Sequence, residues 1–301
     1  MRKLILGFLL LSFLPETIYC QDSLKILSWN IQMLPRGVNS NGKAKRAKAI
    51  ADQLKNSKYD VIVFQELFYK RSRRILTIAL AQQFPFQTPV LNKKGFALKT
   101  NGGVLLISRY PIQKVQQIQY KKRTGPDRLS RKGALLAELN VKGKSVQLIG
   151  THLQAFGLKE IMYSQYQQLQ DELLRPNIKT GVAQIICGDF NTLKEVPSIR
   201  PADLPANFEK RIAQYPVMLQ TLDAEDGVLH GEQQFTMDRP YNDLCKKRKQ
   251  YRLLLDYFLI RPNESPTIVS KRRIQIIRYP WHKNHQDLSD HYGLEAVVSG
   301  Y

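Results

Sequence analysis

The stretch "AQIICGDFNT" (183–192) begins as an apolar run and then turns polar, with Asp189 and Asn191 two positions apart. The apolar part has the length and composition of a strand that is buried on both faces. An acid and an amide follow it directly, where ordinary turn residues would be the norm. They place hydrogen-bonding and metal-binding oxygens at the edge of a core, and several other strands of the chain end in the same way.

Seven further apolar runs have the length of strands and leucine-rich or β-branched centres. They are "LKILSWNI" (24–31), "YDVIVFQEL" (59–67), "GGVLLISRY" (102–110), "GALLAELNV" (133–141), "SVQLIGTHL" (145–153), "YRLLLDYFLI" (251–260) and "GLEAVVS" (293–299). The spacing of apolar residues predicts helices over 42–56, 73–84 and 158–174. In the first helix we expect Ala47, Ile50 and Leu54 on one face and the lysines and arginines on the opposite face.

The order of these segments predicts the fold class. A helix separates the first two strands, so they form a βα unit, and the shorter connections between later strands favour antiparallel pairing. We therefore expect an α/β protein with two packed mixed β-sheets and helices outside them. Hydrophobic residues make up 43% of the 301 residues, which is enough for a sizeable core.

The N-terminal residues read as a targeting segment. "MRKLILGFLLLSFLPETIYC" (1–20) joins two early cations to a short apolar stretch, which is the pattern of a cleavable signal peptide. We expect a secreted or periplasmic protein with one catalytic domain over 21–301. Lipid attachment at Cys20 ranks second, because the usual small residue before the cysteine is missing. Cys187 and Cys245 could form a disulfide, which the sequence leaves open.

The charge balance points to an anionic partner. The chain has 46 basic and 25 acidic residues, a formal net charge of +21. Such a field favours nucleic acid or an anionic bilayer surface, although it can also serve solubility alone. The basic runs "YKRSRR" (69–74), "CKKRKQYR" (245–252) and "KRR" (271–273) could each dock on anionic lipid or simply face solvent.

Polar side chains end, interrupt or directly precede most of the other predicted strands. They are Asn30, Glu66, His152, Asp256, Asp290 and His291. Carboxylates at the edge of a core are costly unless they meet a cation, and oxygen donors suit Mg²⁺ far better than zinc. Histidines beside them can exchange protons near neutral pH. Together these residues predict metal-assisted hydrolysis of a phosphoester.

Short motifs support this hypothesis through a resemblance. "SWNI", "QEL", "GTHLQA", "GDFN", "LDY" and "SDH" occur in the order used by the endonuclease–exonuclease–phosphatase superfamily, which the chain resembles over 24–298. This likeness implies the four-layered α/β sandwich of pancreatic deoxyribonuclease. Within the superfamily, "GPDRLSRKGALLAEL" (125–139) is similar to a Gly-Pro-Asp-x-Leu-Ser-x-Lys-Gly segment of the secreted bacterial neutral sphingomyelinases, and "FTMD" (235–238) resembles their Thr-x-Asp segment.

The resemblance also implies a metal site. Glu66 would be the principal Mg²⁺ ligand, helped by Asn30, with Mn²⁺ or Co²⁺ as alternative ions. Asp290 would serve the metal or the surrounding hydrogen bonds. Phe68 would be the aromatic residue beside the metal and substrate.

Acid–base roles follow from the same likeness. His291 would be the general base that deprotonates the attacking water, with Asp256 holding its imidazole in the right tautomer. Asp189 and Asn191 would position that water or assist a second ion. His152 would stabilise the transition state or assist the leaving alkoxide.

Asp127 and Lys132 resemble an Asp–Lys pair near the substrate phosphate, where Lys132 could neutralise developing charge. The chain departs from the family at Asn101, where some relatives have an acid that orients the first histidine. It also has a short segment where the sphingomyelinases carry an aromatic hairpin. Tyr279 and Trp281 could still contact the membrane there, or Trp281 could pack on the domain.

The function implied is a secreted, Mg²⁺-dependent sphingomyelin phosphodiesterase, which releases ceramide and phosphocholine from sphingomyelin or a related phospholipid in a membrane surface. The alternatives are a secreted nuclease acting on nucleic acid, a phospholipase C or phosphatase with another substrate, and an inactive binding module. A monomer is expected, and no protein partner is inferred.

Overall fold

The computed structural model describes residues 23–38, 42–93, 99–155, 159–194, 208–245 and 250–301, so the predicted signal peptide lies outside the described residues. The longer strands are β1 (Ser23–Met33), β2 (Val61–Leu67), β4 (Leu105–Ser108), β5 (Ile112–Gln119), β6 (Gly133–Val141), β7 (Lys144–His152), β8 (Gln184–Asp189), β12 (Asp256–Arg261), β13 (Ile268–Gln275), β14 (Arg278–His282) and β16 (Gly293–Ser299). The shorter strands are β3 (Phe86–Gln87), β9 (Leu229–His230), β10 (Met237–Asp238), β11 (Arg252–Leu253) and β15 (His285–Asp287).

The helices are α1 (Lys43–Leu54), α2 (Lys70–Ala79), α3 (Lys159–Leu169), α4 (Phe208–Ile212) and α5 (Gln214–Leu222). A 3₁₀ turn covers Gly125–Leu129, and α3 continues into a π turn (Gln170–Leu174) and a 3₁₀ turn (Arg175–Asn177). None of the helices described has the length and apolar character that crossing a bilayer requires.

Two sheets organise these elements. Among the described residues, seven strands form one sheet in the order β3-β4-β2-β1-β16-β13-β9, and five form another in the order β12-β8-β7-β6-β5. Strands β1 and β2 are parallel on either side of α1, which confirms the predicted βα unit. Antiparallel pairing of β6 with β5 and β7 confirms the expectation from short connections, whereas β7 and β8, which flank α3, are parallel.

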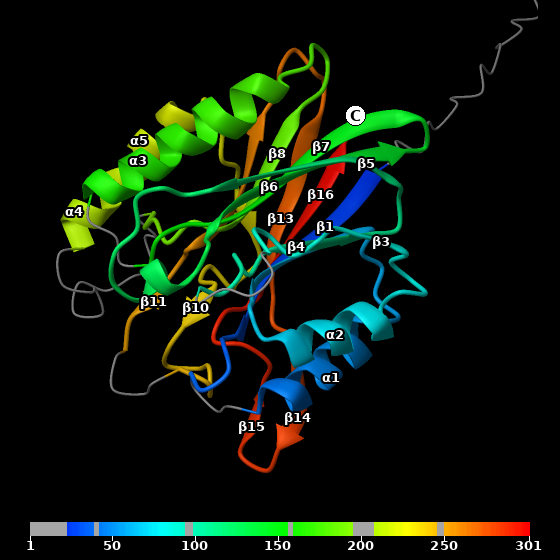
Figure 1. Cartoon of the computed structure of the whole chain (residues 1–301), viewed down its shortest axis with the longest axis vertical. Coiled ribbons are helices and arrows are strands. Elements are labelled where there is room, and N and C mark those ends of the chain that lie inside the picture. The colour runs from blue at the N-terminus through cyan, green and yellow to red at the C-terminus, as the bar shows by residue number, and fades with distance from the viewer. Residues whose placement is uncertain (1–22, 39–41, 94–98, 156–158, 195–207, 246–249) are drawn as a thin grey trace, which may run out of the picture.

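The sheets pack face to face, with α1 and α2 outside one sheet and α3 and α5 outside the other (Figure 1). Alternation along β1 explains how both of its faces are buried. Leu24 and Ile26 belong to the core shared with the second sheet, and Trp29 and Ile31 belong to the core under α1 and α2. The result is the four-layered α/β sandwich that the sequence predicts.

Several predicted elements differ from the observed ones. Helix α2 spans Lys70–Ala79 instead of 73–84, because its first turn carries no apolar signal. The run 251–260 divides into β11, which pairs with β10, and β12, which joins the five-stranded sheet. The alternating strands β5 and β13 are polar on one face, so the search for apolar runs missed them.

Arg46 corrects the expected amphipathic pattern of α1. It is fully buried on the face expected to be apolar, and its guanidinium donates hydrogen bonds to the carbonyl oxygens of Ile31, Gln32 and Leu288. The helix is therefore tied to the end of β1 and to the segment before β16. Cys187 and Cys245 are both free and buried, so they do not form the disulfide that the sequence left open.

Candidate active site

Strands of the five-stranded sheet bring three of the predicted site residues side by side. Asp189, the last residue of β8, lies opposite His152 at the end of β7 and opposite Asp256 at the start of β12. All three side chains are almost fully buried. The register thus gathers a histidine and two carboxylates at one edge of the sheet.

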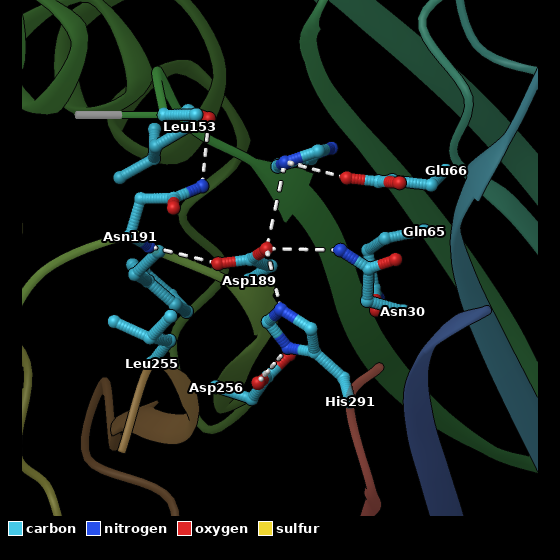
Figure 2. A network of polar contacts seen from close by, with 12 residues as sticks. Asn30, Gln65, Glu66, Leu153, Asp189, Asn191, Leu255, Asp256 and His291 are labelled. Carbon is cyan, nitrogen blue, oxygen red and sulfur yellow. Dashed lines mark hydrogen bonds and ion pairs between the residues drawn. The ribbon is translucent and has the colours of Figure 1, made fainter. Parts of the chain in front are cut away.

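The other sheet supplies Asn30 and Glu66 to the same place. Asn30 of β1 lies beside Gln65 of β2, and the Asn30 amide donates a 3.0 Å hydrogen bond to Asp189 Oδ2, which joins the two sheets (Figure 2). Glu66 has a left-handed backbone with φ of 56°. A non-glycine residue in this conformation is strained, and such strain is concentrated at functional sites.

The segment before β16 completes the cluster with His291. The Trp29 indole donates a 2.8 Å hydrogen bond to the His291 carbonyl, and the Ser289 hydroxyl donates a 2.6 Å bond to the Asn30 carbonyl. Asn242, from the segment that follows "FTMD", donates a 2.8 Å bond to the Ser289 carbonyl. These bonds fix the imidazole of His291 beside Asp189 and Asp256 (Figure 2).

His291 is poised by its carboxylate neighbours. Its Nδ1 lies 2.8 Å from Asp256 Oδ2, and its Nε2 lies 4.0 Å from Asp189 Oδ2. Burial opposes charge on this ring, but the charges of Asp256, Asp189 and Asp290 and the hydrogen bond to Asp256 together outweigh burial and raise the pKa of His291 to about 10. The pair leaves Nε2 as the ring atom that faces the centre of the site.

His152 is held in the opposite charge state. Burial, followed by the charges of Lys132 and His291, lowers the pKa of His152 well below its usual value. Lys132 Nζ lies 2.9 Å from His152 Nε2, 2.9 Å from Asp127 Oδ2 and 3.1 Å from the Leu153 carbonyl oxygen. An ammonium can only donate, so Nε2 of His152 is the acceptor and the positive charge resides on Lys132.

Glu66 and Asp290 form a pair of acids that repel one another. Burial raises the pKa of Glu66 to about 7, and the charge of Asp290 adds to that rise. The Nε2 atom of the neutral His152 lies 4.0 Å from Glu66 Oε1, so this contact does not compensate the charge of Glu66. Asp290 accepts a 2.5 Å hydrogen bond from the Gln32 amide. A hard divalent cation would relieve this repulsion, and the oxygen donors of Glu66, Asn30 and Asp290 fit Mg²⁺.

A second donor cluster lies next to the first. One ligand atom each from Asp189, Asp256 and His291 lie within 4.8 Å of one another. Asp256 is already engaged with His291, and a protonated imidazole cannot bind a metal. Burial, followed by the charge of Asp256, raises the pKa of Asp189 to about 6. The cluster therefore suits proton handling in the metal-free state, while Glu66 and Asp290 are the side chains that most need a cation.

The remaining predicted residues surround this centre. Asn191 donates its backbone N–H to Asp189 Oδ1 and its amide to the Leu153 carbonyl (Figure 2). Asp127 accepts hydrogen bonds from Lys132 and from the Ala155 backbone N–H, both at 2.9 Å. Phe68 is buried, with its ring packed against Gly103.

Asn101 and the two proposed membrane anchors lie apart from the catalytic cluster. The side chain of Asn101 bonds to the Phe68 carbonyl and the Gly103 N–H, so it is not the partner of His152. Trp281 packs against the α1–α2 core and donates to the Asp287 carbonyl, which favours the packing role over a membrane contact. Tyr279 stays exposed.

Two supporting residues escaped the sequence analysis. Gln32 donates a hydrogen bond to Asp290. Arg46 lies among the backbone carbonyls of Ile31, Gln32 and Leu288 and interacts electrostatically with Asp290 and Glu66. Burial lowers the pKa of Arg46 to about 10, and these two acids act in the opposite direction. The sequence did contain a signal for the burial of Arg46, because this residue lies four positions before Ile50 and thus on the apolar face of α1.

Comparisons with known proteins agree with this geometry. The Endonuclease/Exonuclease/phosphatase family model matches residues 27–291. A phospholipase C from Staphylococcus aureus is 26% identical over 305 residues, covering 91% of this chain and 86% of that protein. A sphingomyelinase C from Bacillus cereus is 27% identical over 314 residues, covering 92% and 89%. A beta toxin variant from Staphylococcus aureus with bound magnesium ions is 25% identical with a TM-score of 0.78, covering 91% and 99%.

Proposed function

The chain belongs to the endonuclease/exonuclease/phosphatase family and is a phosphodiesterase, and from this premise we propose that its substrate is sphingomyelin. Hydrolysis would release ceramide and phosphocholine. The observation that carries the proposal is the convergence of Glu66, Asp189 and His291 from three separate segments on one centre (Figure 2). The full-length likeness to a sphingomyelinase C and a phospholipase C supports a phospholipid substrate.

We assign the metal site to Glu66, Asn30 and Asp290. A Mg²⁺ ion held there supplies positive charge that polarises the scissile phosphate. Phe68, two residues after Glu66, has a buried ring and would be the aromatic residue beside this site. The oxygen-only donor set distinguishes the site from the nitrogen and sulfur ligands of zinc centres.

The base is His291. With Nδ1 donated to Asp256, Nε2 faces the site and accepts the proton of the attacking water once the ring is neutral. Asp290 is one of the charges that raise this pKa, so neutralising Asp290 moves His291 toward the range in which it can act as a base. Asp189 and Asn191 orient the water, since Asp189 lies between the two histidines.

Lys132 is the cation that meets the developing negative charge. It is 3% exposed and donates three hydrogen bonds, to Asp127, His152 and the Leu153 carbonyl. His152 thus acts by holding Lys132 in place as well as by facing the reacting phosphate. A buried, preorganised ammonium stabilises a charged transition state without reorganisation.

The substrate assignment is tested by incubating the purified mature protein with three candidate substrates. Sphingomyelin vesicles, phosphatidylcholine vesicles and plasmid DNA are each incubated with Mg²⁺ and with EDTA. We expect phosphocholine release from sphingomyelin with Mg²⁺ alone. Asp189→Asn should abolish it, while Asp223→Asn, an exposed acid, should not. Nicking of DNA without lipid hydrolysis would identify a nuclease, and hydrolysis of phosphatidylcholine alone would identify a phospholipase C.

We also propose that residues 1–20 direct export and that 21–301 form one catalytic domain. The support is the cationic and apolar pattern of residues 1–20 and the continuous family match. Expression of the full chain in a bacterial host, followed by intact mass measurement of the protein outside the cytoplasm, tests this. A mature chain that starts near Gln21 is expected, and retention of Met1 would contradict it.

A further inference from the structure

The three basic runs of the sequence have different fates in the structure. In the run 245–252, residues 246–249 lie outside the described residues, and Arg252 pairs with Asp238 at 2.8 Å. In the run 271–273, Arg272 is buried and donates to the Phe258 and Val269 carbonyls, whereas Lys271 and Arg273 are exposed on β13. In the run 69–74, by contrast, Lys70, Arg71 and Arg74 are exposed and make no ion pair with any described carboxylate. These three charges are therefore not paired within the described part of the fold.

These cations line a groove beside the candidate active site. The groove has a volume of about 550 Å³ and is bounded by Arg36, by the start of α2 and by Phe68, Tyr69 and Asn101. None of its lining residues is acidic, and the first turn of α2 also lacks an acid. Phe68 follows Glu66 by two residues, so the groove opens next to the proposed metal site.

Two exposed apolar side chains flank the groove. Val38 is 50% exposed, in the short turn that begins at Pro35 and includes Arg36. Leu129 is 68% exposed, and its carbonyl accepts the N–H of Thr100, which lines the groove. Lys43 holds the first turn by donating to the Pro35 and Val38 carbonyls. Cations framed by exposed aliphatic side chains match the interface of an anionic bilayer.

We propose that this groove binds the headgroup of an anionic phospholipid and docks the active site on the membrane. The inference rests on the proposed function, since it supplies the surface on which a lipid substrate is met. The lipid phosphate would lie among Arg36, Arg71 and Arg74, while Val38 and Leu129 enter the headgroup layer. Arg73 is excluded from this role because it is bound to the Leu67 and Phe68 carbonyls.

The exposed aliphatic side chains favour lipid over nucleic acid. A nucleic acid backbone would use the same cations, but it gains nothing from exposed valine and leucine side chains at both sides of the groove. A bilayer gains from both features, because apolar burial adds to electrostatic attraction. Nucleic acid binding is therefore an outcome that the test must be able to show.

The test measures binding without turnover. Sedimentation with phosphatidylcholine vesicles, with and without phosphatidylserine, is carried out in EDTA for the wild type and for R71Q/R74Q. The matched control is K271Q/R273Q, which removes two exposed cations from β13. We expect R71Q/R74Q to weaken binding to the anionic vesicles by roughly 10- to 30-fold, since each cation near such a surface contributes about 1 kcal/mol. K271Q/R273Q should lose less than about threefold, because distant charges are screened.

Three outcomes would overturn the proposal. If both double variants lost vesicle binding equally, net charge alone would explain the loss. If the wild type bound both kinds of vesicle equally, an anionic headgroup would not be the ligand. Loss of plasmid binding by R71Q/R74Q with unchanged vesicle binding would make the groove a nucleic acid surface. Hydrolysis of a soluble phosphocholine ester, which should be the same in all three proteins, reports separately on the proposed function.

Discussion

Asp189 is the side chain on which the site converges at the scale of single residues. Its Oδ2 accepts the Asn30 amide and lies 3.5 Å from His152 and 4.0 Å from His291, while Oδ1 accepts the Asn191 backbone N–H. A carboxylate with so many neighbours is fixed in one rotamer. The two histidines beside it are consequently held at defined positions, one charged and one neutral in the metal-free protein.

The first prediction concerns the proposed base. His291→Ala should lower kcat by about 10²- to 10⁴-fold, which is the usual contribution of general base catalysis. His230→Ala removes an exposed histidine from β9 and should leave kcat unchanged. Steady-state phosphocholine release, with circular dichroism to verify folding, measures both. Near-normal turnover by the folded His291→Ala protein would exclude His291 as the base.

The second prediction concerns the pH at which His291 titrates. Because Asp256, Asp189 and Asp290 together raise the pKa of His291 to about 10, the ring in the metal-free protein stays protonated through neutral pH. Its contribution to folding stability is complete below its usual value of 6.5 and is lost as pH rises through about 10. Asp256→Asn removes the charge of Asp256 while Asp189 and Asp290 remain, so the pKa of His291 should fall below about 10. Titration of the imidazole proton resonances by NMR in EDTA measures this, and an unchanged midpoint would contradict it.

The candidate site residues could be named from the sequence because each lies in a short motif next to a strand. Their charge states could not be predicted from the sequence. The charge on Lys132 and the neutrality of His152 arise from a 2.9 Å contact between residues twenty positions apart in the chain. Arg46 was misplaced for a related reason, since its burial depends on carbonyl groups from β1 and from the segment before β16.

At the scale of secondary structure elements, the close approach of β7 and β8 positions the catalytic edge. Gly188, directly before Asp189, has φ of 144°, and a Cβ atom there would lie 2.0 Å from the Thr151 carbonyl oxygen. Only glycine allows the two strands to pair at this point. The glycine of "GDF" (188–190) is thus explained by the packing of β8 against β7, and the aspartate by the chemistry of the site.

Gly188→Ala therefore should push β8 away from β7 and destabilise the fold by about 3 kcal/mol or more. Gly181→Ala is the control, because Gly181 has φ of 73° but no atom near its Cβ position, and strain alone costs about 1–2 kcal/mol. Urea denaturation compares the two variants. If both cost the same, the collision with Thr151 is not what makes Gly188 necessary.

Apolar periodicity located most buried strands but failed where a strand is half exposed. In β13 the lysine and arginines of "KRR" read as a surface run, yet Arg272 turns inward and satisfies two backbone carbonyls. In α2 the cations of the first turn concealed its start, so the predicted helix began three residues too late. The error in β13 comes from an arginine whose partners lie elsewhere in the fold, and the error in α2 comes from a first turn without apolar residues.

At the scale of the whole molecule, metal binding and folding should be linked. Mg²⁺ relieves the repulsion of Glu66 and Asp290 only in the folded state, so it should raise Tm, by an amount that corresponds to about 2.7 kcal/mol at a hundredfold excess over Kd. Glu66→Gln should abolish this rise and the activity together. Calorimetry with Mg²⁺ and with EDTA measures it, with Glu172→Gln on the exterior as the control. An equal rise in the Tm of Glu66→Gln would show that the metal binds elsewhere.

The 2.8 Å hydrogen bond from the Trp29 indole to the His291 carbonyl joins residues 262 positions apart, so the site is assembled from both ends of the chain. His291, the proposed base, and Asp290 directly precede β16, whereas Asn30 lies in β1. A chain cut before Asp290 would lack both of these groups, so we expect it to be inactive even where the earlier strands fold.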